Sequence, residues 1–139
     1  MAAGFRWWHV PRQAKIPTTM TRLIWALQIL VAVAFLAVGT MKLTQARADI
    51  VAMGATYAQD FSDAQVKLIG AAEVAGAVGL ILPAATGILP ILTPIAGVCL
   101  AVLMAGAVNV HAGRGENFIP PLVLGLLAAT VAALRFRKR

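Results

Sequence analysis

The sequence predicts an all-α integral membrane protein, an antiparallel four-helix bundle with a long outer loop, carrying a short surface helix, between the first two helices. Of its 139 residues, 60% are hydrophobic and only 12% are charged, whereas a soluble domain has about 25% charged residues. Four apolar runs each approach the roughly 20 residues needed to cross about 30 Å of hydrocarbon. Lipid cannot satisfy backbone polar groups, so each run is expected to be helical.

The membrane domain is expected over residues 22–135, with spans at about residues 23–42, 66–84, 88–110 and 118–135. The first run follows basic residues, as a signal peptide would. However, it is longer than a usual signal-peptide core and 22 residues precede it, which favours a retained span. A basic and aromatic segment, residues 1–21, precedes the domain, and a basic tail, residues 136–139, follows it.

Four spans place both ends of the chain on one side of the membrane. That side collects eight of the twelve basic residues: Arg6, Arg12, Lys15, Arg22, Arg135, Arg137, Lys138 and Arg139. The positive-inside rule therefore predicts that both termini are cytoplasmic. This clustering, with no Gly-rich phosphate loop and no RNA-binding aromatic motif, argues against nucleic acid as a partner.

The connections between spans differ in length. A short inner turn is expected at residues 84–87, bracketed by Pro83 and Pro90, because proline marks helix ends and helix starts. Residues 111–117 join the last two spans on the outside. Pro120 and Pro121 then fall in the first turn of the fourth helix, where a missing amide costs little.

The longest connection, residues 44–65, lies on the outside. Asp49 is expected to cap a short helix that Gly54 ends. Ser62 and Gln65 have the spacing of a capping box that opens the second span. Long ordered loops are often lids over a site, but a plain connector fits this sequence equally well.

Glu73 is the most informative polar residue within the spans, because a charge in lipid is costly. It lies about two turns, or roughly 10 Å, into the second helix. Its helical neighbours Gly70, Gly76 and Ala77 are all small. Small residues let another helix approach closely, so Glu73 is expected to face the bundle interior.

Lys42 closes the first span on a stripe that also carries Gly39, Phe35 and Gln28. This stripe is expected to face inward, which brings Lys42 and Glu73 into the same outer half of the bundle. An ion pair would give each costly charge a partner. The inner half is expected to be nearly all apolar.

The third span ends outward with two further candidates, Asn109 and His111. Asn109 shares a face with Ala105 and Gly106, so it is expected to point inward. His111 lies about 7 Å or less from the bilayer edge by helical rise. Lys42, Glu73, Asn109 and His111 are therefore the candidates for binding a ligand or carrying a proton.

Two hypotheses explain these polar residues. In one, the Lys42–Glu73 pair and an Asn109 hydrogen bond lock the register of the helices. In the other, they form an outward-facing polar pocket. One His, one Glu and one Asn are too few good ligands for a metal. No nucleophile, base and orienting group occur together, so no catalytic residue is predicted and the chain is not expected to be an enzyme.

Five segments resemble one family when taken in order. They are FLAVGTMK at residues 35–42, VKLIGAAE at 66–73, GLILP at 79–83, ILPILTPI at 88–95, and His111 followed by Arg114 and Glu116. Over roughly residues 22–135 the chain resembles the DoxX-like family of small four-span bacterial membrane proteins. The resemblance implies a four-helix bundle in the cell inner membrane and points to Lys42, Glu73 and His111 as functional positions.

The resemblance implies a role only in outline, since the family's biochemistry is largely unassigned. Some relatives are linked to quinone-coupled or other redox systems, and others to assembly. We expect a small lipophilic, quinone-like ligand, or a subunit of a membrane redox or stress-response system. Dithiol exchange is disfavoured, because Cys99 is the only cysteine and is expected to be buried.

Two alternatives stay open. A small proton-coupled multidrug-type transporter would have this size, although such proteins place the key glutamate in the first span. A purely structural or assembly subunit, paired with a membrane partner or with a second copy, would use the small-residue helix faces for contact.

Overall fold

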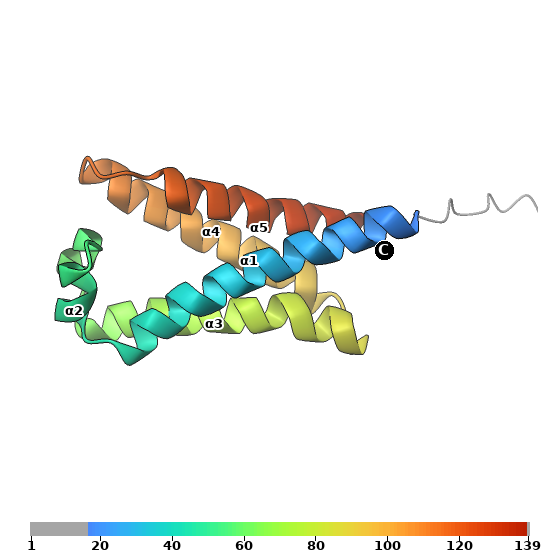
Figure 1. Cartoon of the computed structure of the whole chain (residues 1–139), viewed down its shortest axis with the longest axis horizontal. Coiled ribbons are helices and arrows are strands. Elements are labelled where there is room, and N and C mark those ends of the chain that lie inside the picture. The colour runs from blue at the N-terminus through green and yellow to red at the C-terminus, as the bar shows by residue number, and fades with distance from the viewer. Residues whose placement is uncertain (1–16, 139) are drawn as a thin grey trace, which may run out of the picture.

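The computed structural model describes residues 17–138, so most of the basic and aromatic N-terminal segment and Arg139 lie outside it. Four long helices run side by side (Figure 1): α1 (Thr18–Thr44), α3 (Asp63–Thr86), α4 (Leu92–Gly113) and α5 (Ile119–Arg137). Each is long and apolar enough to cross a membrane. The predicted all-helical membrane bundle is therefore confirmed.

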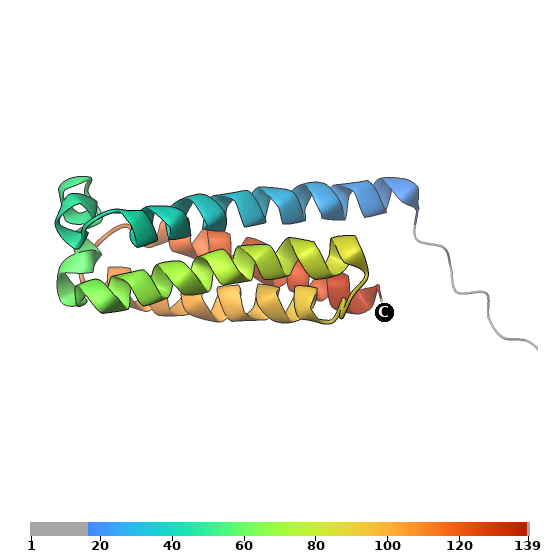
Figure 2. The same cartoon turned by 90° about the horizontal axis from the view of Figure 1, so that it is seen from below.

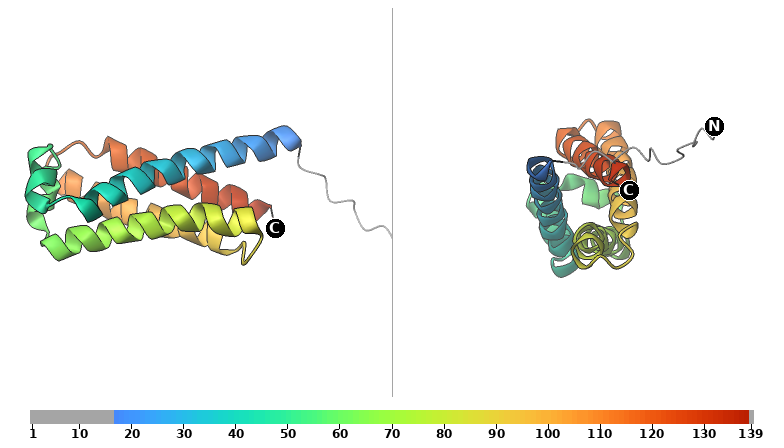
Figure 3. Two further views of the ribbon diagram at one scale, coloured as in Figure 1. Left: turned by 60° about the horizontal axis from the view of Figure 1, so that its bottom comes forward. Right: turned by 90° about the vertical axis from the view of Figure 1, so that its right-hand side faces the viewer.

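Successive long helices are antiparallel, and α1 packs on α3, α3 on α4, and α4 on α5. The two short helices, α2 (Arg47–Ala52) and the 3-10 helix η1 (Thr56–Asp60), lie with the α4–α5 loop at one end, here called the loop end (Figure 2). The start of α1, the α3–α4 turn and the end of α5 lie at the opposite end, here called the terminal end (Figure 3).

The bundle has an apolar interior and an apolar exterior. Phe35, Leu80 and Leu100 are fully buried between the helices. On the outside, Leu68 and Val102 are 71% and 67% exposed. Such a surface would be unfavourable in water and suits the acyl chains of a bilayer.

The turn between α3 and α4 falls later than expected. Pro83 lies inside α3, which continues to Thr86 and ends where Gly87 takes a φ of 71°. Leu89 has a φ of 47°, which is incompatible with a right-handed α-helix. Helix α4 therefore begins only at Leu92. The third span therefore starts about four residues later than the apolar run suggested.

Helices α1 and α3 approach most closely where Gly39 faces Gly70. A Cβ atom on Gly39 would lie 2.8 Å from the Gly70 carbonyl oxygen and 2.9 Å from the Glu73 Cβ. No side chain fits there, which confirms that the small residues around Glu73 serve the approach of another helix.

The segment between α1 and α3 folds across the loop end and contains the expected surface helix. Ser62 and Gln65 form the predicted capping box at the start of α3. Asp49, however, lies within the first turn of α2, and Ala46 is its N-cap. Ile50 is completely buried and packs with Ala58, so a buried apolar contact, rather than a polar cap, positions this short helix.

Candidate functional site

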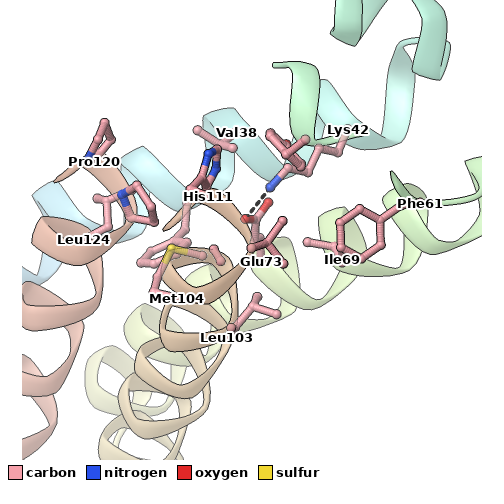
Figure 4. Close-up of a pocket in the computed structure, with 16 residues that line it drawn as sticks. Val38, Lys42, Phe61, Ile69, Glu73, Leu103, Met104, His111, Pro120 and Leu124 are labelled. Carbon is pink, nitrogen blue, oxygen red and sulfur yellow. Dashed lines mark hydrogen bonds and ion pairs between the residues drawn. The ribbon is translucent and has the colours of Figure 1, made fainter. Parts of the chain in front are cut away.

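A cavity of about 410 Å³ opens at the loop end between η1 and the long helices (Figure 4). Most of its wall is apolar, with Phe35, Leu103, Met104 and Leu124 among the lining residues. Three of its polar lining residues are Lys42, Glu73 and His111, which are three of the four candidates predicted from the sequence. The long connection supplies Tyr57 and Phe61 to the same wall.

Lys42 and Glu73 form a buried ion pair at this cavity. Lys42 Nζ donates to Glu73 Oε1 over 2.6 Å, and the two side chains are 7% and 1% exposed. Glu73 Oε2 is buried without a hydrogen-bond partner among the described residues. The pair is neutral as a unit, and it places a strong dipole beside an apolar space.

Tyr57, which the sequence reasoning missed, covers the ion pair from η1. Lys42 Nζ lies 5.9 Å from the centre of its ring, and the His111 ring meets it edge-on with centroids 5.0 Å apart. Burial, and then the negative charge of Glu73, raises the pKa of Tyr57 to about 12. The sequence offered one signal, since Tyr57 is the only tyrosine of the chain and lies in its longest connection.

A set of polar contacts, here called the clasp, holds η1 to the loop between α4 and α5. Thr56 Oγ1 donates to Glu116 Oε1 over 2.5 Å, and Arg114 bonds both Glu116, at 2.7 Å, and Asp60, at 2.5 Å. His111 Nδ1 lies 2.9 Å from Glu116 Oε2. The Thr56 hydrogen bond, followed by the Arg114 hydrogen bond, lowers the pKa of Glu116.

Asn109 does not belong to this site. Its side chain is exposed and lies outside the cavity lining, so the prediction that it faces the bundle is wrong. The buried stripe of α4 contains Leu100 and Met104. Asn109 lies five residues beyond Met104, about 140° around the helix. Its small neighbours Ala105 and Gly106 are exposed as well, and Gly106 lines the cavity without packing against another helix.

Two other expectations about the spans need correction. Cys99 is exposed on the outside of the bundle, where α4 faces away from its neighbours. The inner half is also less apolar than expected: Gln28 is fully buried near the terminal end, and its Oε1 accepts a 2.5 Å hydrogen bond from Arg135 Nε. These two residues are 107 positions apart, so no local pattern could reveal their contact.

The charged groups at the cavity are paired with one another within the described part of the chain. No group of three or more His, Cys, Asp or Glu residues within residues 17–138 could hold a metal ion. The two cavity-side charges neutralise each other, and Glu116 already engages the His111 Nδ1. What remains is an apolar space with a polar wall formed by Tyr57, the ion pair and His111.

Comparison with known protein families gives a match over most of the chain. The sequence profile of the DoxX-like family matches residues 26–133, which contain the cavity, the ion pair and the clasp. No curated protein and no solved structure has significant similarity to the chain.

Proposed function

The chain belongs to the DoxX-like family of multi-pass membrane proteins, and from this premise we propose that it binds a small, uncharged lipophilic molecule at the loop end. The observation that carries the proposal is the cavity of about 410 Å³ with a neutral buried ion pair in its wall. Small-molecule sites are typically 300–1,000 Å³ in volume, mostly apolar, and furnished with a few polar groups that orient the ligand.

The chemistry of the wall defines the ligand class. A charged ligand would have to leave water for an apolar space whose ion pair is already balanced, which is costly. An aromatic ring would contact the Met104 thioether and the Phe35 ring favourably. A carbonyl or hydroxyl group on that ring could meet Tyr57 or His111. A quinone or quinol head has this combination of a flat apolar body and polar edges.

Binding can be tested on the purified protein in lipid nanodiscs, with a short-chain benzoquinone and its quinol as probes. Gly106 lines the cavity, and a Cβ atom there would meet nothing within 4 Å. Gly106→Phe should therefore fill the space without strain and remove binding. Val102→Phe is the matched control, because Val102 lies on the same helix and faces outward. Equal binding by parent and Gly106→Phe would contradict the proposal.

We further propose that the cavity opens to the extracytoplasmic side of the inner membrane and that both termini are cytoplasmic. The support is charge: residues 1–22 and 135–139 carry eight of the twelve basic residues and no Asp or Glu, and basic segments stay on the cytoplasmic side. Exposed positions Gln59 and Arg137 lie at opposite ends of the bundle. In a Cys99→Ala background, Gln59→Cys should react with an impermeant thiol reagent in intact cells, and Arg137→Cys only after lysis. The reverse pattern would overturn this orientation.

A structural role is the second candidate, and the contact between Gly39 and Gly70 favours it. The ion pair lies where α1 and α3 come closest, so it could specify their register and leave the cavity incidental. In that case mild extraction should yield a stoichiometric protein partner and no bound small molecule.

Drug efflux that collapses with the proton gradient would instead support the small proton-coupled transporter.

A further inference from the structure

The charges of the chain are separated between the two ends of the bundle. All five acidic residues belong to the loop half: Asp49, Asp60, Asp63, Glu73 and Glu116. The described residues of the terminal end carry only basic charges: Arg22, Arg135, Arg137 and Lys138. The cations at the terminal end therefore have no acidic side chain of this chain to pair with.

Arg135 is the most constrained of these cations. Its Nε donates to Gln28 Oε1 over 2.5 Å, and Gln28 Nε2 in turn donates to the Leu80 carbonyl over 2.6 Å. The guanidinium also lies over the Trp25 ring, 4.5 Å from its centroid. Two contacts from α1 thus hold this α5 side chain in one orientation, and α3 fixes the Gln28 side chain that makes one of them. This arrangement reduces the entropy cost of binding a ligand.

Among residues 17–138, no acidic group pairs with this guanidinium. Its Nε donates a hydrogen bond to Gln28 Oε1, and its Nη2 is buried with no hydrogen-bond partner in the described part of the chain. This leaves Nη1 for an anion from outside the chain. A cation at the edge of the hydrocarbon is costly unless something compensates it.

Lys138 provides a second cation on the same side of the bundle. It follows α5 directly, and its Nζ donates to Thr21 Oγ1 on α1 over 3.0 Å. Burial, and then the positive charge of Arg135, lowers the pKa of Lys138. Arg135 and Lys138 are three residues apart at the end of α5, which is the spacing of neighbours on one helical face. An anion between them would relieve the repulsion of their charges.

We propose that Arg135 and Lys138 bind the phosphate of an anionic phospholipid between α1 and α5 at the terminal end. Arginine donates strong charge-assisted hydrogen bonds to phosphate oxygens. Arg135 is in the last turn of a membrane-spanning helix, so its depth matches that of lipid headgroups. Trp25 beside it is the residue type enriched at this boundary. This site is separate from the cavity at the loop end.

Native mass spectrometry of the full chain, extracted with mixed phosphatidylglycerol and phosphatidylcholine, tests the proposal. The parent should retain phosphatidylglycerol preferentially. Arg135→Gln should bind it about tenfold more weakly, the loss expected for one charge-assisted hydrogen bond. Arg137→Gln removes the same charge from an exposed position on the same helix and should bind it as the parent does.

Three results would overturn the proposal. Equal weakening by Arg135→Gln and Arg137→Gln would mean that the basic tail acts only through its net charge. Displacement of the lipid by millimolar inorganic phosphate would assign the site to a free anion. If Arg135→Gln does not fold, Lys138→Gln, which removes the second cation and leaves the Gln28 contact intact, should still weaken phosphatidylglycerol retention. Unchanged retention in that variant would count against the site.

Discussion

Gly70 lies directly against Lys42. A Cβ atom on Gly70 would be 2.7 Å from the Cβ of Lys42, closer than two such carbons can approach. The lysine stem occupies the space that any other residue at position 70 would fill. One glycine therefore allows the 2.6 Å ion pair between Lys42 and Glu73 to form.

Gly70→Ala should destabilise the bundle, because its methyl group would collide with the Lys42 Cβ and with the Gly39 carbonyl oxygen. We expect a loss of about 1–3 kcal/mol in the free energy of unfolding, as for other overpacked interiors. Unfolding by denaturant in detergent measures it. Gly106→Ala, where a Cβ would meet nothing within 4 Å, is the control. Similar unfolding curves for both variants would refute the close contact.

Glu73→Gln and Lys42→Met should each destabilise the protein, by about 3–5 kcal/mol where the partner charge is left buried and unpaired. The double variant Lys42→Met with Glu73→Leu should recover much of this loss. If the two charges orient the ligand, Glu73→Gln should not bind the quinone probe. The double variant should not bind it either, even though its stability recovers. Recovery of binding along with stability would mean that the pair only holds α1 against α3.

Tyr57 should ionise at an unusually high pH. Its pKa of about 12 in the folded state lies above the ordinary value of 10.0, so folding favours the neutral phenol. Its contribution to stability is therefore present below pH 10 and is lost as the pH rises through the folded pKa. The chain has one tyrosine, so phenolate absorbance reports this group alone. A midpoint near 10 would show that Tyr57 does not cover the ion pair.

The clasp should weaken when Glu116 loses its charge. The pKa of Glu116 is lowered in the folded state, so its contribution is present above the ordinary glutamate pKa and is lost as the pH falls through the lowered value. Glu116→Gln should speed amide hydrogen exchange across α2 and η1 at neutral pH. Asp49→Asn, at an exposed position on α2, removes the same charge as a control. Equal exchange rates in the two variants would show that Glu116 does not hold the clasp together.

The sequence by itself determined the membrane class, the four spans and the inward-facing stripe of α1. These features depend on local requirements: about 20 apolar residues to cross the bilayer, and backbone polar groups that must be satisfied within each helix. The same holds for the capping box at Ser62, whose contacts span three residues. The inward-facing stripe of α1 is buried at Gln28, Phe35, Gly39 and Lys42. Exposing its two polar side chains to lipid would be energetically unfavourable, so the stripe faces the bundle interior.

Only the tertiary structure decided how α4 is rotated and what the connections cover. The rotation of α4 is set by the packing of Leu100 and Met104, which turned Asn109 outward although its neighbours are small. Thr56 meets Glu116 across 60 positions and Gln28 meets Arg135 across 107. Such contacts follow from the crossing of whole helices, because side-chain spacing along one helix specifies its own faces but not which neighbour each face will meet.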